Sequence, residues 1–76
     1  MSFKDAKLKI SRDDKGDIEI AGNRQGMELL ASVCTGLSKL SDEEAKTPAN
    51  HYHLAEYIGT AEPGSIPAEL FLKLDW

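Results

Sequence analysis

The segment from Gly26 to Leu40 constrains the fold most, because it is the only long stretch of the chain with a clean helical period. Its apolar residues recur at spacings of three and four, which places them on one stripe of a helix: Met27, Leu30, Val33, Cys34, Leu37 and Leu40. Asn23 is a candidate N-cap, because its side-chain oxygen can accept a free amide of the first turn. A helix of about 15 residues is marginal by itself, so this one needs a surface made by other elements.

Two alternating segments before the helix are typical of half-buried strands. Residues 6–11 and 17–21 each place apolar side chains at every second position. If Ile10 lies opposite Ile20 on the buried face, the connection is a three-residue loop, Asp14-Lys15-Gly16, with its glycine in the left-handed region. A two-residue loop would bring the wrong faces together.

Two further strands are expected after the helix, at residues 51–58 and 68–76, separated from it and from each other by polar loops with Pro48 and Pro63-Gly64. The sequence therefore predicts an α+β fold of order ββαββ: one four-stranded, mostly antiparallel sheet with one helix packed on one face. Residues 1–76 would form a single domain. The residues expected beneath the helix share alternating apolar positions: Leu8, Ile10, Ile18, Ile20, Leu54, Leu70 and Leu72.

The size of the chain indicates a marginally stable domain that partner binding would stabilise, and its composition indicates the compartment. A chain of 76 residues buries a modest share of its surface. Its single cysteine permits no internal disulfide, which fits a reducing compartment. No segment reads as a signal peptide or reaches membrane-spanning length. We therefore expect a cytoplasmic protein with no membrane partner.

Charge is distributed unevenly along the chain. Residues 1–40 carry seven basic and six acidic residues, whereas residues 41–76 carry two basic and seven acidic ones, so the second half has a net charge of −5. Nucleic-acid binding is disfavoured, because phosphate contacts need a basic face. The acidic half favours a basic protein partner through electrostatic steering; alternatively, it keeps a small protein soluble.

No catalytic or metal-binding signature stands out in the sequence. His51 and His53 occupy alternate positions and would point to the same side of a strand, but two ligands do not make a metal site. Cys34 falls on the apolar stripe of the helix and is expected to be a buried filler rather than a nucleophile. The carboxylate pairs lie in predicted turns, where nothing would perturb them for acid–base chemistry. We therefore expect no enzymatic activity, no metal and no cofactor.

Several short tracts resemble immunity protein family 32, a family of small immunity proteins from bacterial polymorphic toxin systems. The resemblance spans about residues 17–74 and rests on four tracts: Gly26-Met27-Glu28-Leu29-Leu30-Ala31 after Gly22-Asn23, His51-Tyr52-His53-Leu54, the loop Gly64-Ser65 and the strand Leu70-Phe71-Leu72. It implies an α+β layout and an antitoxin role, in which the protein binds a cognate toxin domain and blocks its active site. It also implies that His51 and His53 are functional positions.

The resulting hypothesis is an immunity protein whose acidic half covers the basic cleft of a toxin. The expected partner-binding residues are the exposed ring side chains and nearby loop acids: His51, His53, Tyr57, Asp42, Glu43, Glu44 and Glu62. A homodimeric structural or adaptor module is the alternative, because the last strand could pair with a copy of itself. A small enzyme or ligand-binding domain is a third class, but the chain lacks a nucleophile–base pair.

Overall fold

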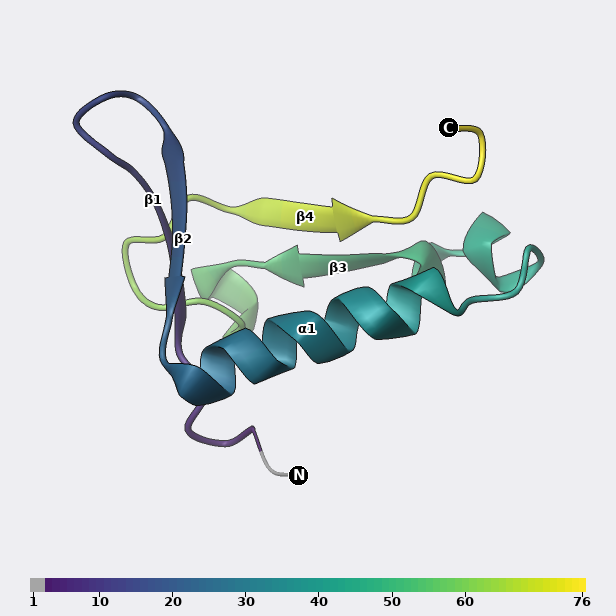
Figure 1. Ribbon diagram of the computed structural model, residues 1–76, viewed down its shortest axis with the longest axis horizontal. Coiled ribbons are helices and arrows are strands. Elements are labelled where there is room, and N and C mark those ends of the chain that lie inside the picture. Colours follow the sequence, from purple (N-terminus) through teal and green to yellow (C-terminus); the bar gives the residue numbers. More distant parts are fainter. Residues whose placement is uncertain (1–2) are drawn as a thin grey trace.

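Two β-hairpins that cross each other, and one long helix, make up the computed structural model, which describes residues 3–76 (Figure 1). The elements follow in the order β1 (Leu8–Arg12), β2 (Ile18–Gly22), α1 (Arg24–Ser38), β3 (His51–Leu54) and β4 (Ala68–Phe71), with short 3₁₀ turns at Glu44–Lys46, Pro48–Asn50 and Glu56–Ile58. The α+β class and the ββαββ order are confirmed. In the part of the chain that the structure describes, no helix has the length and apolar character needed to cross a membrane.

The first hairpin has the register that its apolar pattern predicts. Ile10 pairs with Ile20 in the antiparallel β1–β2 ladder. The amide of Asp13 donates to the carbonyl of Asp17, which leaves a three-residue loop between them. Gly16 in that loop has a φ of 88°, the left-handed conformation that glycine adopts without strain.

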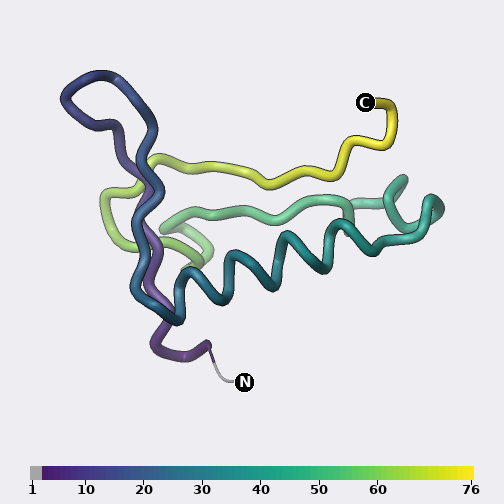
Figure 2. Tube along the Cα trace, in the orientation of Figure 1, coloured from purple at the N-terminus to yellow at the C-terminus, as the bar shows by residue number. Residues whose placement is uncertain are grey.

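The outer edge of β1 is occupied by a loop rather than by a third strand. The amides of Glu62 and Ile66 donate to the carbonyls of Leu8 and Ile10, at 2.7 and 2.8 Å. The Ser65 hydroxyl accepts the amide of Ile10 at 3.2 Å. The segment that links β3 to β4 therefore runs beside β1 (Figure 2).

The prediction of one four-stranded sheet is wrong, because this loop uses the hydrogen-bonding edge that a third strand would need. β3 and β4 instead form their own antiparallel pair, and the structure has two separate two-stranded sheets. Tyr52 lies opposite Leu70 in the second sheet, and Leu54 lies opposite Ala68.

Helix α1 begins where its cap residue predicts. Asn23 Oδ1 accepts the amide of Gly26 at 2.7 Å, and the helix runs to Ser38. Gly26 is the one buried residue of α1, although half-buried apolar side chains follow it along the stripe. Cys34 is exposed, contrary to prediction. Beyond its first turns, α1 extends away from β2 (Figure 1).

The core lies between the two hairpins, not between a sheet and a helix. Leu8, Ile10 and Leu54 are almost fully buried. The half-buried residues that pack against them come from several elements: Leu30, Tyr52, Ala61, Ala68 and Leu70.

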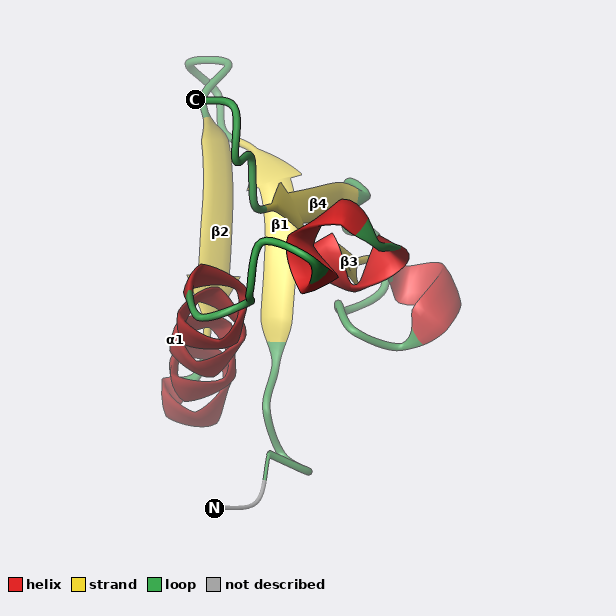
Figure 3. Cartoon of the chain, turned by 90° about the vertical axis from the view of Figure 1, so that its right-hand side faces the viewer, coloured by secondary structure: helices red, strands yellow, loops and turns green. Residues whose placement is uncertain are grey.

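Ile18 and Ile20 on β2 are 50% and 42% exposed, so the prediction that both lie beneath the helix is wrong. β3 and β4 lie beyond β1, on the side away from β2, while α1 continues from the end of β2 (Figure 3). The core therefore centres on β1, and β2 is left at its margin.

Candidate binding face and histidine pair

One face of the β3–β4 hairpin packs on the core, and the other carries rings and charges in the open. Side chains alternate along each strand, so the outer face takes its residues from two cross-strand pairs. His51 lies opposite Phe71, and His53 lies opposite Glu69. We call these four residues, together with Tyr57, the imidazole face.

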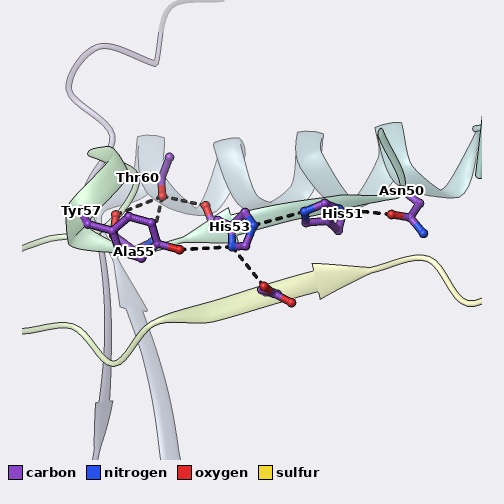
Figure 4. A network of polar contacts seen from close by, with 7 residues as sticks. Asn50, His51, His53, Ala55, Tyr57 and Thr60 are labelled. Atoms are coloured by element: carbon purple, nitrogen blue, oxygen red, sulfur yellow. Dashed lines mark hydrogen bonds and ion pairs between the residues drawn. The ribbon is translucent and has the colours of Figure 1, made fainter. Parts of the chain in front are cut away.

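The two histidines are joined in one chain of polar contacts (Figure 4). The Nε2 atoms of His51 and His53 lie 3.2 Å apart. His51 Nδ1 lies 3.2 Å from Asn50 Oδ1, and His53 Nδ1 lies 3.2 Å from Glu69 Oε1. Each imidazole is therefore held at its Nδ1 atom by an oxygen of its own.

Ring contacts fix the orientation of both imidazoles. His51 stacks on Phe71, with ring centroids 5.0 Å apart and 17° between the planes. The two imidazoles meet edge to face, at 4.8 Å and 84°. Lys73 Nζ lies 5.7 Å from the centre of the Phe71 ring. Such ring arrangements contribute about 0.5–1.5 kcal/mol each, so the face is ordered before any partner arrives.

Tyr57 joins this face by a route that the sequence did not indicate. The expected strand over residues 51–58 ends at Leu54, and Tyr57 lies in the 3₁₀ turn Glu56–Ile58. Thr60 stabilises this change of direction, because its hydroxyl donates to the carbonyl of His53 at 2.7 Å and accepts the amide of Ala55 at 2.9 Å. The Tyr57 hydroxyl still comes within 3.5 Å of His53 Nδ1.

The four acidic residues of the predicted site fall into two separate places. Asp42, Glu43 and Glu44 follow α1 in the connection to β3, at the right of Figure 1. Glu62 belongs to the β3–β4 loop, and its amide is bonded to β1. This loop lies at the left of Figure 1. The structure thus brings His51, His53 and Tyr57 together, but not the acids.

Glu44 has a local structural role. Its carboxylate accepts the amide and the hydroxyl of Ser41, at 3.2 and 3.0 Å, and its own amide donates to the Ser41 hydroxyl at 3.1 Å. This reciprocal arrangement is a capping box. Of the three loop acids, Glu44 is therefore the least suited to contact a partner.

Two members of the histidine network were missed from the sequence, Asn50 and Glu69. Glu69 alternates with the core residues of the last strand, so the sequence already indicated that its side chain lies on the outer face. The register that places it opposite His53 was not visible, because a long loop joins β3 to β4 and leaves their pairing open.

Comparison with known proteins identifies no relative of this chain. A scan against protein-family models, a search of curated proteins and a search of solved structures each found no significant match. Among residues 3–76, no three His, Cys, Asp or Glu side chains are grouped so that they could hold a metal ion between them. What the site offers chemically is an exposed, pre-ordered cluster of rings with two coupled imidazoles.

Proposed function

We propose that this chain is an immunity-type protein of the bacterial cytoplasm, which binds a cognate toxin domain and blocks its active site. The proposed role is stoichiometric binding, with no enzymatic activity and no cofactor of its own. The resemblance of its short tracts to immunity protein family 32 supports the choice of a toxin as partner.

The observation that carries a binding function is the amount of surface left open. The accessible area is 5510 Å², whereas a compact monomer of 8.3 kDa exposes about 4,600 Å². The difference is close to the roughly 800 Å² that each partner contributes to a standard interface. The Cα radius of gyration of 13.3 Å also exceeds the value of about 11.4 Å for a compact domain of this length.

The imidazole face is the proposed centre of the contact. Interfaces are enriched in aromatic rings that are rigid before binding. Tyr57 is 70% exposed and Phe71 is 48% exposed, and the stacking of His51 on Phe71 holds two of the rings in place. A toxin surface can therefore dock on these rings without first ordering them.

The first test is recovery of the partner from the native host. A tagged chain is used as bait, and the co-purifying proteins are identified by mass spectrometry. We expect one protein in stoichiometric amount, toxic when expressed alone and harmless when expressed with this chain. Recovery of the bait alone would contradict the proposal.

A pair of variants connects the partner to the face. Tyr57→Ala should weaken binding roughly 10-fold or more, since exposed aromatic anchors carry much of the binding energy. Ile20→Ala, on β2, is the control and should leave affinity unchanged. Equal affinities of the parent chain, Tyr57→Ala and Ile20→Ala for the partner would show that the interface lies outside the imidazole face.

A homodimeric module is the second candidate, and open strand edges favour it. β2 and β4 each pair on one side only within the described residues, and an open edge can add a strand from another chain. Sedimentation at several concentrations tests this reading. A mass that stays at 8.3 kDa over the whole range would rule it out.

A further inference from the structure

The hydrogen-bond acceptors around His51 and His53 determine what their ring nitrogens can bind. The amide oxygen of Asn50 and the ionised carboxylate of Glu69 only accept hydrogen bonds. In the tautomer with hydrogen on Nδ1, His51 and His53 each donate to one of these oxygens. In neutral imidazoles with hydrogen on Nδ1, both Nε2 atoms hold lone pairs, yet these atoms lie 3.2 Å apart. Two facing lone pairs repel each other unless a cation or a proton lies between them.

The surroundings of the pair match those of metal-ligating histidines. Such histidines donate their second ring N–H to a carboxylate or another oxygen, which fixes the tautomer and makes the free nitrogen a better ligand. Glu69 provides this acceptor for His53, and Asn50 provides it for His51. The supporting contacts are thus in place on both sides.

We propose that His51 and His53 together bind a borderline transition-metal ion, such as Zn²⁺, Ni²⁺ or Cu²⁺, through their two Nε2 atoms. Metal–nitrogen bonds of 2.0–2.1 Å separate two ligating nitrogens by about 2.9–3.4 Å, according to the coordination geometry. The observed separation of 3.2 Å falls within this range. The ion would lie about 1.3 Å off the line between the nitrogens.

Water completes the coordination of this ion. Because the described residues provide no third His, Cys, Asp or Glu ligand and the face is open, the site suits ions that accept imidazole and retain water. Imidazole selects Cu²⁺, Ni²⁺ and Zn²⁺, with Cu²⁺ bound most tightly. Hard ions that require several oxygen ligands, such as Ca²⁺ and Mg²⁺, are excluded. The inference does not depend on the proposed toxin partner, because the free chain is tested.

The first experiment is calorimetric titration of the tag-free protein with Ni²⁺ and with Zn²⁺. The Cys34→Ser background removes the exposed thiol, which would otherwise compete for metal. We expect one ion per chain, and no heat with Mg²⁺. His51→Ala and His53→Ala should each weaken binding by at least about 10-fold, since even the loss of a supporting residue costs that much. Absence of binding, or unchanged affinity in either variant, would overturn the proposal.

Nitrogen-15 spectra of the imidazole rings provide a second measurement. His51 and His53 are the only two histidines in the chain, so every ring signal is assigned to this pair. Ni²⁺ should broaden both sets of ring signals, and Zn²⁺ should shift both Nε2 resonances while Nδ1 keeps its hydrogen. A change confined to one ring would contradict a shared ion.

Glu69→Ala keeps both imidazoles and removes one supporting acceptor. We expect affinity for Ni²⁺ to fall about 10-fold, with an unchanged backbone spectrum as evidence of folding. Glu19→Ala, which removes a carboxylate from β2, is the matched control and should bind as the parent does. Equal affinities for these two variants would contradict the positioning role of Glu69.

Discussion

At the residue scale, Gly26 shows how closely the N-terminal segment approaches the helix. A Cβ atom at this position would overlap the carbonyl oxygen of Lys7 and lie 2.9 Å from its carbon. Backbone atoms cannot move aside as the end of a flexible side chain can. The glycine is therefore required by packing, although it is a poor helix former.

We expect Gly26→Ala to lower the free energy of unfolding by about 2–3 kcal/mol, because the new methyl group forces the chain apart. Gly36→Ala is the matched control in the same helix. Nothing lies within 4 Å of a Cβ at position 36, so this change should raise stability by roughly 0.5–1 kcal/mol. Urea unfolding followed by circular dichroism measures both, and equal signs would contradict the close approach.

Asn23 joins the helix to the N-terminal segment through a single side chain. Its Oδ1 atom accepts the amides of Gly26 and Lys7, at 2.7 and 3.0 Å, and its Nδ2 donates to the carbonyl of Asp5 at 2.8 Å. Asn23→Ala should cost about 2 kcal/mol, since it removes both the cap and the bridge.

Asn23→Asp keeps the acceptor and places a negative charge at the helix N-terminus, which is favourable. It should therefore lose less than half as much stability as the alanine variant in thermal melts. If the two variants have the same melting temperature, the hydrogen bond from Asn23 Nδ2 to Asp5 contributes most of the stability and the helix cap contributes little.

At the element scale, the loop of residues 59–67 substitutes for a strand. It satisfies the outer edge of β1 with two backbone amides and the hydroxyl of Ser65. It contains Pro63 and Pro67 and has no alternating pattern, so it shows none of the signals of a strand. It nevertheless contributes Ala61 to the packing around the core.

Ser65→Ala tests the loop at the hydrogen bond that its side chain makes with β1. The amide of Ile10, a residue only 1% exposed, would lose its acceptor, at a cost of about 1–2 kcal/mol. Ser65→Thr keeps the hydroxyl and should retain most of the stability. Hydrogen exchange at the Ile10 amide should accelerate in the alanine variant alone; equal protection in both variants would contradict the contact.

Local patterns predicted the first hairpin and the start of α1, because their causes are local. The expected strands 51–58 and 68–76 are shorter in the structure and end at Leu54 and Phe71. The pairing of Ile10 with Ile20 follows from one short loop, and the start of α1 follows from one cap, Asn23. The arrangement of the hairpins depends instead on the loop that covers β1, whose backbone contacts leave no mark on side-chain periodicity.

The candidate site was predicted only in part for the same reason. His51 and His53 share a face by simple alternation, but Glu69 joins them through a register that no short turn fixes. Tyr57 was assigned to the correct face from a strand that in fact ends at Leu54.

At the scale of the whole molecule, the proposed association with a basic partner depends on exposed acidic side chains. Asp42 and Glu43 are exposed in the acidic half, and no described residue makes a polar contact with either carboxylate. They are better targets for charge reversal than Glu44, whose carboxylate caps its own turn.

The double change Asp42→Lys and Glu43→Lys should slow association with a basic partner by roughly 10-fold at low salt. The dissociation rate should change little, and the salt dependence of association should weaken. Stopped-flow mixing at several salt concentrations measures this, with Asp14→Lys and Asp17→Lys, at the opposite end of the molecule, as the control pair. Equal association rates in both pairs would show that net charge alone matters.

Trp76 is 96% exposed and is the only tryptophan, so its fluorescence reports on the C-terminus. In the free protein its emission should match that of fully hydrated indole and change little on unfolding in urea. Trp76→Phe should alter stability by less than about 0.5 kcal/mol. A blue-shifted emission in the free chain that disappears on dilution would instead indicate self-association through this end.

The bond between Ser65 and β1 also determines when the protein can fold. Ile10 and Ser65 are 55 positions apart in the sequence, and chain segments emerge from the ribosome in order, N-terminal first. The first hairpin and α1 are thus synthesised while one edge of β1 and the core between the hairpins are still open. Contacts of such long sequence separation slow folding, because the chain loses loop entropy before it gains them. The native structure can therefore be completed only after residues 60–71 have been translated.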